Sequence, residues 1–196
     1  ALAELHVAGA DFTLKRPNAL AIDGWRKLWE GSRDRADEVE KGLAAEVDAD
    51  FALFDREWPK NLPLGVIHAD LFPDNVFFLG EKLSGLIDFY FACTDMTAYN
   101  IAVTHAAWCF DGEGKRFDPA LSAALLAGYD SVRPISTAER AALPVLARGA
   151  AMRFLMTRAF DWMNTPVGAM VTRKDPLAFA RRLQFYADPA NNCVFG

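Results

Sequence analysis

The sequence has few of the residues from which disulfide networks, zinc sites and membrane spans are built. Only three of its 196 residues are cysteine and three are histidine. The cysteines, Cys93, Cys109 and Cys193, are too scattered for a disulfide framework or a zinc site, so we expect a protein of the reducing cytoplasm. No apolar run approaches the roughly 20 residues that a transmembrane helix needs, and we expect no membrane partner.

Basic residues are not in excess either. Lysine and arginine number 21 against 26 acidic residues, a net charge of -5. Nucleic-acid binders usually carry a basic stripe that replaces counterions on phosphates, so we expect no nucleic-acid partner. The hydrophobic fraction of 52% is that of an ordinary globular domain, long enough to form one sizeable core.

A glycine-rich phosphate loop is also missing. The best match, Gly112-Glu113-Gly114, has Phe117 where a third glycine would fall. No strand carries a lysine placed to pair with a helical glutamate over phosphates. The chain starts without methionine, in a stretch that already has a helical pattern, and it shows no signal peptide. The expectation is a fragment of a longer protein.

Hydrophobic periodicity predicts an α+β fold that is mostly α, with a small antiparallel β element amid helices. The pattern is helical over 1–63, where an apolar face from Val39 to Phe54 predicts a helix that ends before Pro59. The charged residues Asp37, Glu38, Glu40 and Lys41 are expected on its solvated face. Three short β-type runs follow at 65–68, 75–79 and 83–89, with Gly80 in the turn between the last two. Further helices are predicted at 97–110, 118–130, 137–163 and 175–186, and Pro144 is expected to divide the third or to start it.

The central β region carries the residues with chemical potential. His68, Asp70 and Asn75 have the spacing H-x-D-x-x-x-x-N, and Asp88 ends an apolar run eighteen residues after Asp70. A hairpin would bring Asn75 close to Asp88. Phosphoryl transfer needs a carboxylate near the attacking hydroxyl and oxygen ligands for magnesium, and these residues can supply both. Each residue alone has an ordinary structural explanation, as a turn or a cap. Asp70, Asn75 and Asp88 together, on a strand–loop–strand–turn–strand pattern, favour kinase chemistry.

The stretch His-Ala-Asp-Leu-Phe-Pro-Asp-Asn and the later Ile87-Asp88-Phe89 resemble the catalytic loop and metal motif of aminoglycoside phosphotransferase and choline kinase-like enzymes. The resemblance implies the C-terminal catalytic lobe of a kinase-like fold over 1–196. It implies Asp70 as the catalytic base or hydroxyl-orienting residue, Asn75 and Asp88 as magnesium ligands, and His68 as a structural residue of the loop. It also implies ATP as a substrate.

Within that family, several flanking segments resemble type II homoserine kinases. These segments are 16–19, 89–96, 148–154, 157–162 and 174–177. The resemblance implies transfer of the ATP γ-phosphate to the side-chain hydroxyl of L-homoserine, a step toward threonine. An ATP-covering lobe of roughly 100 residues, about a domain's worth, would then precede residue 1. The isolated chain would be inactive or nearly so.

A zwitterionic acceptor needs a cation for its carboxylate and an acid for its ammonium group. Arg153 and Arg158 are candidates for the first, Asp74 or Asp161 for the second, and Tyr90 is a further candidate contact. For each charged residue singly, an ordinary ion pair is the simpler explanation. The aromatic residues Tyr90, Trp108 and Trp162 are more simply core residues, and His6 and His105 are expected to be structural.

Two departures from the family pattern leave the acceptor open. Asn100 stands where these families usually have Asp, and Ala106-Ala107 replace the polar residues expected before Trp108. Other acceptors within the same fold are an aminoglycoside, choline or another hydroxylated amine. An acidic pocket would suit an aminoglycoside, whereas this chain's C-terminal helices are rich in arginine (Arg148, Arg153, Arg158, Arg181 and Arg182). A degenerate kinase-like domain used only for binding is the alternative from another class.

Overall fold

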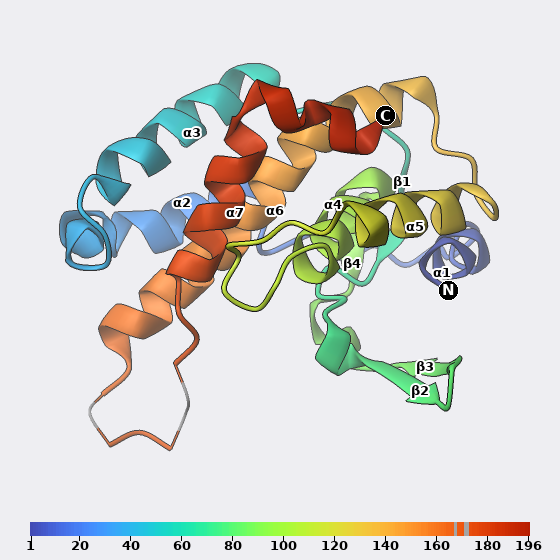
Figure 1. The fold of residues 1–196 in the computed structure, drawn as a ribbon, viewed down its shortest axis with the longest axis horizontal. Coiled ribbons are helices and arrows are strands. Elements are labelled where there is room, and N and C mark those ends of the chain that lie inside the picture. Colours follow the sequence, from blue (N-terminus) through green and yellow to red (C-terminus); the bar gives the residue numbers. More distant parts are fainter. Residues whose placement is uncertain (167, 171–172) are drawn as a thin grey trace.

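The computed structural model describes residues 1–166, 168–170 and 173–196. Its α-helices are α1 (Leu2–Ala8), α2 (Ile22–Glu30), α3 (Leu43–Glu57), α4 (Thr97–Trp108), α5 (Pro119–Asp130), α6 (Thr137–Asn164) and α7 (Leu177–Ala187). Its strands are β1 (Leu64–Ile67), β2 (Val76–Leu79), β3 (Lys82–Leu86) and β4 (Cys93–Met96), and four short 3₁₀ helices lie at Arg33–Glu38, Pro73–Asn75, Phe89–Phe91 and Pro189–Phe195. Figure 1 shows the predicted mixture of many helices and little sheet.

The strands form two separate antiparallel pairs. β2 pairs with β3 across the turn at Gly80, whose φ of 62° is in the left-handed region that glycine adopts easily. β1 pairs with β4, which aligns Leu64 with Met96. The three predicted runs correspond to β1, β2 and β3, and the predicted mostly α fold with a small antiparallel β element is confirmed. β4 was not predicted, because it is short and half polar and its partners, β1 and the segment at Arg16 and Pro17, are distant in sequence.

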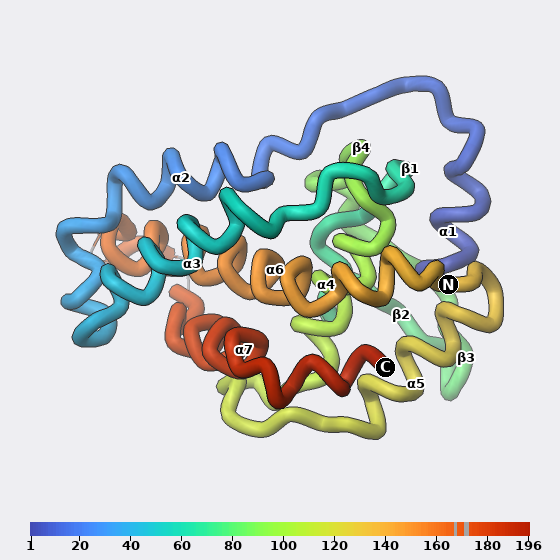
Figure 2. Tube along the Cα trace, turned by 90° about the horizontal axis from the view of Figure 1, so that it is seen from above, coloured from blue at the N-terminus to red at the C-terminus, as the bar shows by residue number. Residues whose placement is uncertain are grey.

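The long helix α6 runs through the middle of the molecule, with α2 and α3 on one side and α7 on the other (Figure 2). The predicted division at Pro144 is wrong, because the helix is continuous from 137 to 164. A capping box between Ser136 and Glu139 starts it about two turns before the proline. Burial of Leu143 and Leu146 against the neighbouring helices offsets the backbone hydrogen bond that Pro144 cannot donate.

Helix α3 begins later than its apolar pattern predicts. Gly42, with φ of 90°, precedes it, so Val39 lies outside the helix. The charged residues 37, 38, 40 and 41 lie in the preceding 3₁₀ helix and turn, and they do not form a solvated face of α3. The apolar face itself is confirmed, since Leu43, Val47 and Phe54 are buried.

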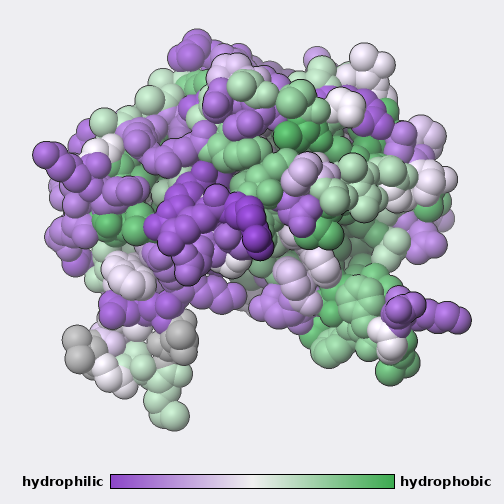
Figure 3. Space-filling model, viewed as in Figure 1, coloured by the Kyte–Doolittle hydropathy of each residue, from purple (hydrophilic) through white to green (hydrophobic). Residues whose placement is uncertain are grey.

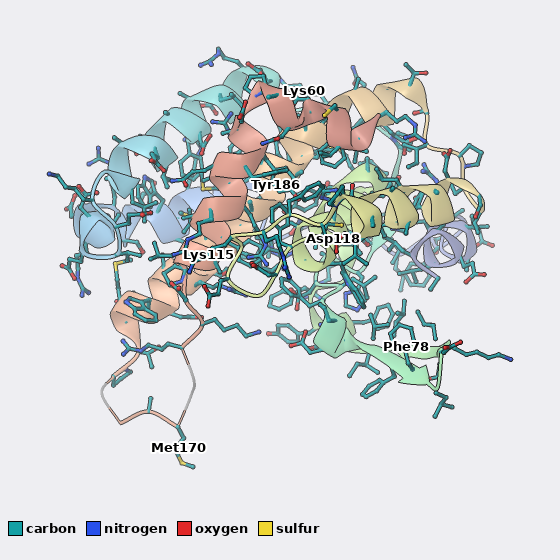
Figure 4. The ribbon with its side chains drawn as sticks, in the orientation of Figure 1. Lys60, Phe78, Lys115, Asp118, Met170 and Tyr186 are labelled. Atoms are coloured by element: carbon teal, nitrogen blue, oxygen red, sulfur yellow. The ribbon has the colours of Figure 1, made fainter. Side chains whose placement is uncertain are left out.

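The core around α4 contains the predicted structural histidines. The Nδ1 of His105 lies 2.6 Å from the hydroxyl of Tyr186, and its Nε2 lies 2.8 Å from the hydroxyl of Ser122. His6 also has a hydrogen-bond partner at each ring nitrogen, the hydroxyl of Tyr129 at Nδ1 and the side-chain oxygen of Asn100 at Nε2. Figure 4 shows Tyr186 among the helices at the centre of the molecule. Both histidines are therefore buried with hydrogen-bond partners.

The prediction for the three aromatic residues is mostly wrong. Tyr90 is 71% exposed and Trp162 is 38% exposed. Tyr90 lies in the segment after the hairpin rather than on a packed helix face, and Trp162 lies near the end of α6. Trp108 is half-buried, and its indole N–H donates to the carbonyl of Leu71 at 2.9 Å.

The β2–β3 hairpin extends away from the helices and has an apolar surface. Phe77, Phe78 and Leu79 are at least half exposed. Figure 3 shows this green surface below the main body, and Figure 4 places Phe78 on it. None of the described helices is long and apolar enough to cross a lipid bilayer.

Candidate active site

The loop from His68 to Asn75 connects β1 to the hairpin. Ala69 has φ of 64°, an uncommon conformation for a residue with a side chain, which turns the chain sharply after the strand. The amide of Phe72 then donates to the carbonyl of Asp70 at 2.9 Å. Pro73 starts the short 3₁₀ helix that leads into β2, where its fixed φ suits the first position. The loop is therefore tightly folded on itself.

His68 is completely buried and connects three segments. Its backbone amide donates to the side chain of Asn100 at 2.7 Å. Its Nε2 lies 2.8 Å from the carbonyl of Ile87, which can only accept, so Nε2 carries the proton. Its Nδ1 then accepts from the amide of Asp70 at 3.3 Å. These contacts connect the amide of Asp70 to Ile87, the residue before Asp88, through the ring of His68.

Asp70, Asn75 and Asp88 line one cavity, of about 750 Å³. The amide nitrogen of Asn75 donates to the backbone carbonyl of Asp70 at 2.8 Å, and Ile87 donates to the carbonyl of Asn75 at 3.0 Å. The predicted hairpin is confirmed by the pairing of Val76 with Leu86. It brings the two ends of the motif together, as the spacing predicted.

Asp88 presents its carboxylate from an unusual backbone position. Its φ is 59° and its ψ is 60°, in the left-handed region that aspartate tolerates better than most residues. Its Oδ1 accepts from the amide of Tyr90 at 3.4 Å, which starts the 3₁₀ helix Phe89–Phe91. Arg16 donates to the carbonyl of Tyr90 at 2.7 Å and so anchors that segment from a distant part of the chain.

The carboxylate of Asp70 is partly buried beside a cation. Burial raises the pKa of Asp70, and the nearby Arg153 and His68 oppose that rise. Arg153 Nη2 lies 3.9 Å from Asp70 Oδ1. Asp70 is thus a carboxylate of increased basicity at the edge of a cavity, which is what a general base requires.

Arg153 is itself enclosed by protein. It is 1% exposed, and its guanidinium donates to the carbonyl of Ala69. The guanidinium lies over the rings of Phe91 and Phe154, at 5.3 and 4.7 Å from their centres. Its position favours support of the catalytic loop over contact with a substrate.

Of the other residues predicted to bind the substrate, some line this cavity and one does not. Asp74, Arg158 and Asp161 line the same cavity as Asp70. Tyr90 does not line it. Asp74 is exposed, and its carboxylate lies 3.9 Å from the ammonium of Lys174. Of the five arginines that favoured a carboxylate-bearing acceptor, the cavity includes only Arg153 and Arg158.

Several cavity residues were not predicted from the sequence. Phe72, Phe91, Thr157 and Lys174 all line it. Phe72 is in the loop motif, and Thr157 follows Arg153 by one helical turn, so both could have been found from spacing. Lys174 is separated from the motif by a hundred residues, and only the fold brings it near Asp74.

Asn100, the departure from the family pattern, still holds the loop. Its Oδ1 accepts from the amide of His68 and lies 3.3 Å from Nε2 of His6. Its Nδ2 is buried without a hydrogen-bond partner among the described residues. The neutral amide therefore supplies the acceptor that the loop needs, without the charge of an aspartate.

The oxygen atoms of the cavity suit a magnesium ion bound together with phosphates. The amide nitrogen of Asn75 is used by Asp70, which leaves its oxygen as a candidate ligand in the cavity that Asp88 also lines. No group of three or more His, Cys, Asp or Glu that could hold a metal occurs in the described part of the chain. Magnesium usually takes one or two carboxylates and completes its shell with water and substrate phosphates, so the residues present fit it.

Curated relatives with high identity share one description. A homoserine kinase of Mesorhizobium japonicum is 64% identical over 95% of this chain and 58% of its own length. Those of Chelativorans sp. and Rhizobium etli (strain CIAT 652) are 61% and 58% identical over the whole chain and 61% of their own lengths. The chain therefore spans about three fifths of the length of these relatives.

Solved structures show the same fold at low identity. A choline/ethanolamine kinase family protein from Mesorhizobium loti matches with a TM-score of 0.63 at 17% identity, covering 99% of this chain and 62% of that one. A choline kinase from Cryptosporidium parvum matches with a TM-score of 0.64 at 14% identity, covering 95% of this chain and 62% of that one. The fold is thus that of choline kinase-like proteins.

A family model described as the phosphotransferase enzyme family matches residues 1–135. This range includes His68, Asp70, Asn75 and Asp88, together with the hairpin that groups them. The chain belongs to the phosphotransferase enzyme family.

Proposed function

We propose that this chain is the acceptor-binding, catalytic lobe of an ATP- and magnesium-dependent kinase that phosphorylates the side-chain hydroxyl of L-homoserine. The observation that carries the proposal is the grouping of Asp70, Asn75 and Asp88 on one cavity that also presents a cation, Arg158, and a further acid, Asp161. Homoserine kinases that are 58–64% identical support the choice of acceptor.

Asp70 has the role of catalytic base. The acceptor hydroxyl attacks the γ-phosphorus of ATP, the bond from that phosphorus to the β,γ-bridging oxygen breaks, and the hydroxyl proton passes to Asp70. The products are the phosphate ester and ADP. The partly buried position of Asp70 and the contacts of His68 to its amide fix the carboxylate where a hydroxyl can reach it.

Asn75 and Asp88 would hold magnesium between them. When bound, the ion supplies positive charge that neutralises the phosphates of the nucleotide. The protein's own part is to keep the two oxygen ligands together. The hydrogen bond from Ile87 to Asn75 and the pairing of β2 with β3 do this.

An ATP-covering lobe in another part of the protein completes the proposal. The chain spans only 58–61% of the length of its relatives, which leaves room for such a lobe. The exposed apolar surface of the β2–β3 hairpin, at Phe77, Phe78 and Leu79, is a surface of the kind that another domain or a nucleotide base covers.

The test is magnesium-dependent ADP release by the complete gene product, with L-homoserine, choline and an aminoglycoside compared side by side. We expect ADP release with L-homoserine and not with the other two acceptors. In Asp70→Ala the rate of this release should fall by about 10²- to 10⁴-fold, the usual contribution of a general base. Asp55→Ala is the control, because Asp55 pairs with Arg26 on the surface. Release with another acceptor would overturn the substrate, and silence with all three would favour a binding domain.

A further inference from the structure

Two arginines five residues apart on α6 line the cavity with opposite surroundings. Arg153 is buried, donates to Ala69 and lies beside Asp70. Arg158 is half-buried, and within the described part of the chain no carboxylate lies within 4 Å of its guanidinium. The two arginines therefore differ in their surroundings, although both lie on one helix and line one cavity.

The guanidinium of Arg158 is poorly neutralised by the protein. Among the described residues it makes one hydrogen bond, from Nη1 to the backbone carbonyl of Asp175 at 3.2 Å. Both Arg158 and Arg182 stack on the ring of Phe179, each 4.5 Å from its centre. Burial, followed by repulsion from Arg182, lowers the pKa of Arg158 to about 10. A guanidinium has five N–H donors, so most of its hydrogen-bonding capacity is available to a ligand.

Acidic residues lie on the same cavity as Arg158. Asp161 follows Arg158 by three residues on α6, which places both on one side of the helix. Asp74 contributes a second exposed carboxylate, 3.9 Å from Lys174. A cation and acids at the mouth of one cavity complement a small molecule that has a carboxylate and an ammonium group as well as a hydroxyl.

We propose that Arg158 binds the α-carboxylate of the acceptor and so restricts the substrate class to hydroxylated α-amino acids. This inference rests on the proposed function of the cavity. A phosphate of the nucleotide is the other anion that could reach a free guanidinium. The carboxylate is favoured for two reasons. In the proposed function the phosphates are neutralised by the magnesium ion that Asn75 and Asp88 would hold, so they do not need Arg158. No other cation of the described cavity is both desolvated and without a carboxylate partner.

The experiment compares L-homoserine with 3-aminopropan-1-ol in the complete gene product. The second compound has the same hydroxyl, chain and ammonium group but no carboxylate. Binding is measured by calorimetry and turnover by ADP release, for the wild type, Arg158→Met and Arg158→Lys. The control is Arg181→Met, because Arg181 donates to the carbonyl of Glu113 and does not line the cavity.

We expect Arg158→Met to raise the Kd and KM of L-homoserine by about 10- to 150-fold, the range for loss of a hydrogen bond to a charged group. The KM of ATP and the low kcat/KM for 3-aminopropan-1-ol should not change. The ratio of kcat/KM values for the two acceptors should therefore fall. Arg158→Lys should restore part of the affinity, because it keeps the charge but not the planar donor pair. Arg181→Met should behave as the wild type.

The contrary outcomes are separable. A rise in the KM of ATP with no change for L-homoserine would assign Arg158 to the nucleotide and overturn the inference. Equal loss for both acceptors would also overturn it, since the missing contact would then not involve the carboxylate. If Arg158→Met does not fold, the same comparison is made with Arg158→Lys. If the wild type phosphorylates another hydroxylated amino acid instead, the proposed substrate fails while the role of Arg158 holds. If the wild type binds neither acceptor, both proposals fail.

Discussion

The guanidinium of Arg153 lies 3.9 Å from the carboxylate of Asp70 and donates a hydrogen bond to the carbonyl of Ala69, the residue before it. A buried cation on α6 thus contacts both the backbone and the side chain of the catalytic loop. Ala69 has a positive φ, so its conformation depends on contacts of this kind. Arg153 connects the central helix of the fold to the position of the proposed base.

Replacement of Arg153 should therefore affect catalysis rather than binding. We expect Arg153→Met to lower kcat by about 10²-fold or more while the KM of L-homoserine changes little, because misplacement of a catalytic group by about 1 Å has effects of that size. Arg153→Lys should recover part of kcat. Steady-state kinetics of the two variants beside Arg158→Met make the comparison. A large rise in the KM of L-homoserine with unchanged kcat would contradict this role and would indicate that Arg153 contacts the substrate.

Gly149 should tolerate no side chain, although it lies within a helix. A Cβ built there would overlap the ring of Trp58 and come within 3.2 Å of Trp25. We expect Gly149→Ala to lower the free energy of unfolding by about 1–3 kcal/mol, the usual cost of overpacking. Gly128→Ala on α5 is the matched control, because nothing lies within 4 Å of its Cβ position. There the better helix propensity of alanine should raise the free energy of unfolding by about 0.5–1 kcal/mol. Urea titrations would measure both, and equal effects would contradict the packing argument.

Stability should fall below pH 6.5 because two histidines are buried uncharged. Burial lowers the pKa of His6 to about 4 and that of His105 to about 3. Both values lie below the unfolded value of about 6.5, so between these limits the unfolded chain binds more protons than the folded one. The free energy of unfolding therefore rises with pH between these pKa values and falls as the pH is lowered through them. The change is up to about 1.4 kcal/mol per pH unit for each histidine.

Urea unfolding at pH 7, 6 and 5 checks this dependence, with His105→Gln as the comparison. The variant should be less stable at pH 7, since it disturbs the contacts to Tyr186 and Ser122, but its stability should change less with pH. Asp50 works in the opposite direction, because burial raises its pKa to about 6 and the folded state then binds the extra proton. The difference between variant and wild type removes that contribution. An unchanged slope would show that His105 is not the titrating group.

Much of the candidate site could be predicted because its parts are close in sequence. Asp70 and Asn75 share one loop, and Asp88 follows within a single hairpin, so the short turn at Gly80 suffices to group them. The helices were likewise predicted from local apolar spacing. Their exact starts were less predictable, since Ser136 and Gly42 rather than the hydrophobic pattern set where α6 and α3 begin.

What could not be predicted depends on contacts between distant segments. β4 is a strand because β1, about thirty residues earlier, pairs with it, and because the amide of Thr94 donates to the carbonyl of the still more distant Arg16. Tyr90 and Trp162 are large aromatic residues of the kind that is often buried, but the fold leaves both exposed.

By itself, the sequence determined the chemistry of the site: an acid, an amide and a second acid at a spacing that a hairpin brings together. Only the tertiary structure distinguished the surroundings of Arg153 from those of Arg158, which are equivalent in sequence as arginines of the same helix. Where α6 crosses the catalytic loop, Arg153 is enclosed by Ala69, Phe91 and Phe154; one and a half turns later the helix faces the cavity and leaves Arg158 without a carboxylate partner among the described residues. The physical reason is that helix periodicity sets which residues share a side, whereas packing sets what that side meets.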